Sequence, residues 1–240
     1  MRGDVITLDR AVDLAHTGDI WLFRGTSRAD RAIRGLTNAP VNHVGMAVAL
    51  DDLPPLMWHA ELGRSLPDMW TGKRQRGVQL HDLRDAVLQW GQRYGQRGWV
   101  RQLSGELTRE HEDGLLRAIA RLDGTPFPSM AALAGRWLRG RAPRLRHAAE
   151  EADEASLATA YCAEVVAATF VEMGLLVDDH RPSWYDPGRF WSGDDLELAP
   201  GFALGGEIEV VLPPAAEAAG SAPKPVAARR RVRWPPPLRR

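Results

Sequence analysis

Two segments with alternating side chains, residues 43–50 and 56–62, constrain the fold most strongly. In each segment one face is bulky and apolar, while the other carries histidine, glutamate and small residues: the first reads His43, Gly45, Ala47 and Ala49 against Val44, Met46, Val48 and Leu50. A period of two is typical of a β-strand whose faces meet different surroundings. We therefore predict two neighbouring antiparallel strands that place His43, His59 and Glu61 on one side.

The chain has a single cysteine, Cys162, within "TAYCAEVVAATF". An intramolecular disulfide and a structural zinc site of several cysteines are therefore excluded. Apolar side chains at helical spacing predict a helix over residues 161–173, with Cys162 in its first turn and Gly174 after its end. Unpaired N–H groups and the helix dipole stabilise a thiolate at such a position, so Cys162 is a candidate nucleophile.

His43 is the candidate base for that thiol, since a paired cysteine and histidine attack carbonyl carbons. The small residues beside His43 would let the Cys162 helix lie close against that face of the sheet. A third polar group must orient the imidazole, and His59 and Glu61 are the available side chains. The alternative interpretation makes Cys162 and His43 ordinary core residues.

In chain order, the blocks "GDIWLF", "NHVGMAV", "WHAEL" and "YCAEVV" resemble the circularly permuted branch of the NlpC papain-like superfamily, which includes YiiX-like and lecithin:retinol acyltransferase-type proteins. The resemblance covers about residues 18–185. It implies an α+β, permuted papain-like fold with a small antiparallel sheet packed against a helical layer. It also implies Cys162 as nucleophile, His43 as base and His59 as third residue, with Glu61 in reserve.

The predicted function is a cysteine-dependent hydrolase that cleaves an amide, peptide or acyl bond through a thioester on Cys162. The backbone N–H of Cys162 is the expected oxyanion donor. Tyr161 and Asp19 are weaker candidates for oxyanion or substrate contacts, and Asp19 fits better as a strand-start residue bonded to backbone. The alternatives are a lipid acyltransferase or thioesterase of the same fold, and a catalytically silent binding module.

No cofactor or metal is expected. Two histidines and Cys162 could ligate zinc, but no further ligand stands at a short helical spacing from any of them. The other histidines lack a supporting context and are interpreted as surface residues: His16, His81, His111, His147 and His180.

Residues 1–212 are predicted to form one domain and residues 213–240 a disordered Pro/Arg-rich tail. Seven of the 31 basic residues and none of the 31 acidic ones follow Ala222, so residues 1–222 carry a net charge of −7. An acidic body does not favour a nucleic-acid-binding core. The segment 223–240 could contact an anionic membrane or nucleic acid weakly.

The expected partner is a small acyl-amide or peptide substrate, and the sequence leaves the oligomeric state open. Acidic residues in the first ten positions argue against a signal peptide, so a cytoplasmic location is expected. Periodicity predicts further helices over residues 7–16, 27–36, 108–122 and 130–138, and further strands over 19–23, 77–80, 99–103 and 203–212.

Overall fold

The computed structural model describes residues 4–25, 40–50, 53–61, 63–126, 154–177, 180–194 and 196–214. The helices predicted over residues 27–36 and 130–138 lie outside these ranges. The same holds for the tail from residue 215 onward.

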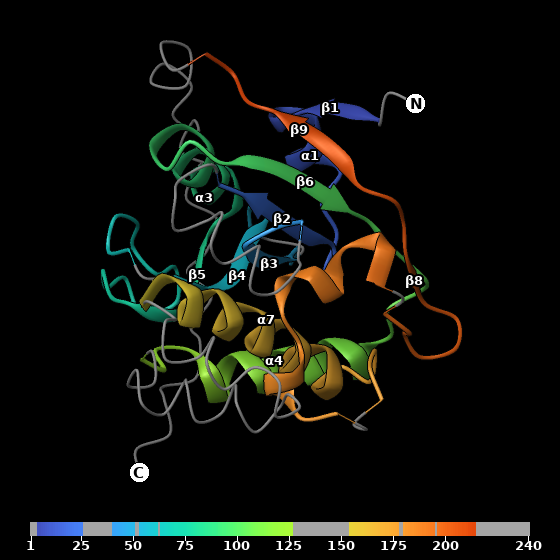
Figure 1. Ribbon diagram of the computed structural model, residues 1–240. Coiled ribbons are helices and arrows are strands. Elements are labelled where there is room, and N and C mark those ends of the chain that lie inside the picture. Colours follow the sequence, from blue (N-terminus) through green and yellow to red (C-terminus); the bar gives the residue numbers. More distant parts are fainter. Residues whose placement is uncertain are drawn as a thin grey trace, which may run out of the picture.

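A seven-stranded sheet with the order β1-β9-β6-β2-β3-β4-β5 forms the centre of the protein (Figure 1). Its neighbours are antiparallel except for β1 and β9, which are parallel. The strands are β1 (Val5–Thr7), β2 (Ile20–Arg24), β3 (His43–Val48), β4 (Leu56–Glu61), β5 (Gly77–Asp82), β6 (Arg97–Arg101) and β9 (Ile208–Val211). A separate pair joins β7 (Leu103–Ser104) to β8 (Ala203–Leu204).

Helices cover both faces of this sheet. The long helix α7 (Glu154–Glu172) packs on β3 and β4, and α4 (Arg109–Leu122) packs against α7. The opposite face carries α1 (Leu8–Asp13) and α3 (Leu83–Leu88), which continues into the π-helical turn η1 (Gln89–Arg93). Short 3-10 turns, η3 (Pro182–Trp184), η4 (Pro187–Phe190) and η5 (Ser192–Asp194), follow α7 in the chain.

The α7 helix packs on the bulky face of β3 and β4, so its predicted placement on the small-residue face is wrong. One apolar core joins Cys162 and Val166 of α7 to Val44, Met46 and other bulky strand residues. A buried hydrogen bond of 2.9 Å from Trp58 Nε1 to Thr169 Oγ1 ties α7 to β4. Bulky strand residues bury more apolar area against a helix than glycine and alanine do, which favours this arrangement.

The small residues of β3 make room within the sheet instead. A Cβ atom on Gly45 would lie 2.4 Å from Sδ of Met57 and 3.3 Å from Cβ of His59. Both neighbours belong to β4. Gly45 is therefore small because the side chains of the adjacent strand cross over it.

The α+β class is confirmed, but the sheet is larger than predicted and has helices on both faces instead of one helical layer. Most predicted elements are found within a few residues of their expected bounds. The closing segment 203–212 differs, because it divides into β8 and β9. The elements β1 and α3 were not predicted. Within the described residues, no helix is long and apolar enough to cross a membrane.

The contact between α4 and α7 depends on Gly114. A Cβ atom there would lie 2.2 Å from the carbonyl oxygen of Glu172, a backbone atom that cannot rotate away. We expect Gly114→Ala to lower the free energy of unfolding by about 1–3 kcal/mol, although alanine is the better helix former. Urea denaturation measures this, with Gly193→Ala as control because its new Cβ would meet nothing closer than 3.8 Å. Equal stability of the two variants would contradict this packing.

Candidate active site

Three buried imidazoles from three adjacent strands form a continuous row. His43 begins β3, His59 lies on β4 and His81 on β5, and all three are at most 3% exposed. His43 Nε2 lies 3.0 Å from His59 Nδ1, and His59 Nε2 lies 2.9 Å from His81 Nδ1. The prediction that His43 and His59 share a face and lie close together is confirmed.

The indole of Trp90, on η1, fixes the ring of His43. The two rings stack with centroids 3.7 Å apart and planes 7° apart. Trp90 also packs edge-on against His59 and Tyr94. The row therefore lies between the sheet and the α3/η1 segment, on the face away from α7.

Gln79 determines how the protons of the row are arranged. Its Nε2 donates to the carbonyl oxygen of Gln75, so its Oε1 is the atom that faces His81 Nε2, at 3.2 Å. An amide oxygen only accepts, so Nε2 of His81 carries the proton and its Nδ1 accepts from His59. His59 Nδ1 then accepts from His43 Nε2, and Nδ1 of His43 is left without a proton.

Burial keeps the row neutral. It lowers the pKa of His43 to about 3 and that of His81 to about 4. The pKa of His59 falls well below its usual value, first through burial and then through its two histidine neighbours. At neutral pH the rings are thus acceptors and donors of hydrogen bonds, without net charge.

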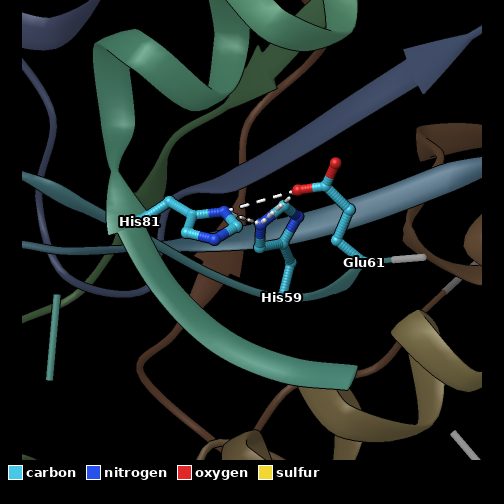
Figure 2. Close-up of side chains that lie close together, drawn as sticks. All are labelled: His59, Glu61 and His81. Atoms are coloured by element: carbon cyan, nitrogen blue, oxygen red, sulfur yellow. Dashed lines mark hydrogen bonds and ion pairs between the residues drawn. The ribbon is translucent and has the colours of Figure 1, made fainter. Parts of the chain in front are cut away.

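Glu61 points from β4 toward the same row (Figure 2). Its Oε1 accepts a 3.0 Å hydrogen bond from the hydroxyl of Tyr94, whereas its Oε2 is buried without a hydrogen bond. That oxygen lies 3.4 Å from His81 Nδ1 and 3.9 Å from His59 Nε2. Burial raises the pKa of Glu61, against smaller lowering effects of Tyr94 and Arg93. The ligand atoms of His59, Glu61 and His81 are close enough together to hold a metal ion.

Cys162 is the ninth residue of α7 and is fully buried, so its predicted place in the first helical turn is wrong. Its backbone N–H lies within the helix, where such groups bond to the preceding turn, and it is not the free oxyanion donor that was expected. Burial raises the pKa of Cys162 to about 12, although backbone N–H groups, that of Val44 first, lower it in part. The resting group is a thiol.

The sulfur nevertheless lies next to the start of β3. The ladder between β3 and β4 begins only at the pair Met46 and Trp58, so it leaves out Val44, whose N–H bonds to the sulfur of Cys162. Cys162 therefore approaches the backbone beside His43 from the α7 side. No hydrogen bond joins the sulfur to the imidazole, because the ring lies on the other face of the strand, against Trp90.

The remaining predicted site residues have structural surroundings. Both carboxylate oxygens of Asp19 accept 2.9 Å hydrogen bonds from backbone, one from His16 N–H and one from Leu103 N–H, which confirms its strand-start interpretation. Tyr161 is buried in the α7 core beside Cys162. Of the two candidates for the third residue, only His59 bonds to His43.

The interpretation of His81 as a surface residue is wrong, since it is 1% exposed and ends the imidazole row. The strand predicted over residues 77–80 ends two residues too early, since β5 continues to Asp82. Its alternation continues through Gln79 and His81 on one face, so this signal was present in the sequence. His16 and His180 are exposed and His111 is half-buried, while His147 lies outside the described residues.

Comparison with known proteins finds similarity to solved structures only. No protein-family model matches the sequence, and neither does any curated protein. The crystal structure of the metalloprotein YiiX from Escherichia coli O157:H7, also designated DUF1105, is similar, with a TM-score of 0.43 and 19% sequence identity. The match covers 79% of this chain and 96% of YiiX.

The buried histidines predict a loss of stability in acid. A histidine whose pKa is about 4 when folded and 6.5 when unfolded binds its proton preferentially in the unfolded chain as the pH falls below 6.5. For His81 this amounts to about 2 kcal/mol at pH 5. Urea unfolding in EDTA at pH 7.5 and pH 5 should show that the wild-type protein loses about this much more stability than His81→Gln.

The control for this measurement is His16→Gln, which changes an exposed histidine outside the row. Acidic groups with raised pKa values act in the opposite direction, and those away from His81, such as Asp19, cancel in the comparison between variants. An identical pH dependence of wild type and His81→Gln would contradict a neutral, buried His81.

Proposed function

We propose that the protein is a cysteine-dependent hydrolase of amide or acyl bonds, with Cys162 as nucleophile and His43 as general base. The observation that carries the proposal is the 3.0 Å contact between His43 Nε2 and His59 Nδ1. Through the row that ends at Gln79, this contact leaves Nδ1 of His43 free to accept a proton. The same contact joins His43 of β3 to His59 of β4, the two histidines that the sequence pattern predicts on one face.

The pKa directions favour a neutral resting pair over a thiolate and imidazolium ion pair. The thiol of Cys162 has a raised pKa and the imidazole of His43 a lowered one. The thiol proton therefore passes to His43 Nδ1 only as the sulfur attacks the carbonyl carbon. The imidazolium then returns this proton to the leaving amine or alcohol, and a thioester remains on Cys162.

Water resolves the thioester in the second half of the reaction. His43 takes a proton from the water as its oxygen attacks, and the proton returns to the sulfur as the acid leaves. Throughout, His59 Nδ1 accepts a hydrogen bond from Nε2–H of His43 and so holds the ring in one tautomer. His59 is therefore a positioning residue, which His81 and Gln79 orient in turn.

The sulfur must come closer to Nδ1 of His43 for this chemistry. The hydrogen bond from Val44 N–H already places Cys162 at the residue next to His43, where β3 and β4 are not paired. Because the ring lies on the other face of β3, the reaction requires this end of the strand to rearrange so that the sulfur and the imidazole meet. The resemblance to YiiX-like and NlpC-type sequences supports the same pairing, with a small acyl amide or peptide as substrate.

Three substitutions test the assignment on a panel of aryl esters and aminoacyl anilides. Cys162→Ala should lower kcat/KM by at least about 1,000-fold and His43→Ala by roughly 100- to 10,000-fold. His59→Ala should act mainly on kcat and shift its pH profile, because it changes the tautomer of His43 without touching substrate. His16→Ala is the matched control on an exposed histidine.

Mass spectrometry of the acylated protein identifies the bond that is cleaved. A mass increase on Cys162 that hydroxylamine removes supports the thioester. Transfer of the acyl group to an added amine or alcohol in preference to water would make the protein an acyltransferase of the same mechanism. Full activity of Cys162→Ala would exclude Cys162 as the nucleophile. If neither the panel nor cell extract acylates the wild-type protein, the alternative of a non-catalytic binding module is favoured.

The neutral resting pair makes a separate prediction for alkylation. Iodoacetamide reacts with thiolates, so at pH 7 Cys162 should react at least about tenfold more slowly than the same residue in the urea-unfolded chain. Intact-mass measurements over time give both rates. Faster reaction in the folded protein at pH 6, lost in His43→Ala, would show an ion pair in place of two neutral groups.

A further inference from the structure

The side chains of His59, Glu61 and His81 form a compact group that the hydrolase mechanism uses only in part. They come from the neighbouring strands β4 and β5, and none is more than 2% exposed. Each directs one atom that can serve as a metal ligand to a common point: His59 Nε2, which loses its proton when a metal binds, Glu61 Oε2 and His81 Nδ1 (Figure 2). The separations are 2.9 Å between the two nitrogens, 3.4 Å from Glu61 Oε2 to His81 Nδ1 and 3.9 Å from Glu61 Oε2 to His59 Nε2.

We propose that these three residues bind a zinc ion, with a water molecule as the fourth ligand. Zinc binds nitrogen and carboxylate oxygen at roughly 2.0–2.1 Å in a tetrahedron, whose edges are then about 3.4 Å long. The three separations lie on either side of this value. Two histidines and one glutamate with an open fourth position are a ligand set that zinc accepts.

The outer contacts of the three side chains support the assignment. Each group has a second polar atom that faces away from the common point, and each of these atoms is hydrogen bonded. His59 Nδ1 bonds to His43, His81 Nε2 to Gln79 Oε1, and Glu61 Oε1 accepts from the hydroxyl of Tyr94. Partners of this kind orient the ligands of zinc sites and fix their tautomers.

The independent sign of a missing ligand is Glu61 Oε2. It is a buried carboxylate oxygen with no hydrogen-bond donor among the described residues, and it faces two nitrogens that can share only one proton between them. Arg93 is the cation that acts on Glu61 electrostatically, but its guanidinium hydrogen bonds to Ser65 instead. A divalent cation at the common point would take both nitrogen lone pairs and balance the carboxylate.

The site does not depend on the proposed role of Cys162, which is no ligand in it. The test therefore uses metal binding by the full chain, dialysed against EDTA. Competition with a chromogenic chelator should show one equivalent of Zn²⁺. One equivalent of Co²⁺ should give the intense visible bands of tetrahedral cobalt without the thiolate-to-metal absorption that a cysteine ligand produces.

Variants locate the ion. His81→Ala and Glu61→Gln should weaken zinc binding by at least about 100-fold, whereas Cys162→Ala and His16→Ala should bind as the wild type does. Tyr94→Phe changes a 38% exposed residue that a folded chain tolerates, and it should weaken binding about tenfold with an unchanged circular dichroism spectrum.

Several results would overturn the site. They are binding of less than one equivalent, wild-type affinity in Glu61→Gln, or loss of binding in Cys162→Ala with a thiolate band in the cobalt spectrum. Where a ligand variant fails to fold, unchanged affinity of Tyr94→Phe would count against the proposal. Hydrolysis is measured in EDTA, because a metal on His59 Nε2 would leave the proton of His43 on its Nδ1, the atom proposed as the base. Loss of hydrolysis in Cys162→Ala with retained zinc binding would then separate the two activities.

Discussion

The contact between the imidazoles of His43 and His59 joins β3 and β4 where their backbone ladder is absent. Only three residue pairs, from Met46 and Trp58 onward, connect these strands through main-chain register. Before that point the strands are held by side chains: the imidazole row on one face and Cys162 with the α7 core on the other. Because the N–H of Val44 takes no part in the ladder with β4, it can bond to the sulfur of Cys162, which lies on the α7 side of β3.

Side-chain alternation was enough to predict much of this arrangement. It placed His43, His59 and Glu61 on one face, because a period of two leaves no other way to sort those residues, whereas the α+β class was what the family resemblance implied. It did not determine which helix covers which face. A small residue such as Gly45 makes room either for a helix or for a neighbouring strand, and here the space is filled by Met57 and His59 of β4.

Other parts of the site depend on contacts between distant segments. Trp90 stacks on His43 because α3 continues into η1, an element that no periodic pattern predicted. The helix start is a second case, since the apolar stripe around Cys162 marks a helical face but not the residue where the helix begins. The observed helix begins seven residues before the predicted start, and Cys162 is therefore a buried thiol within the helix instead of a candidate thiolate in its first turn. The catalytic roles assigned from the sequence remain predictions.

The row of imidazoles also has a direction. In a line of neutral rings every proton points the same way, and the carbonyl oxygen of Gln79 sets that way by accepting at one end. If a cation bound to His59 Nε2, the proton of that ring would have to be on its Nδ1. His59 Nδ1 would then donate to His43 Nε2, and His43 would carry its own proton on Nδ1, the atom that has none in the metal-free row. Binding of a cation on β4 would thus reverse the direction of the hydrogen bond between β4 and β3, although only hydrogen atoms change position.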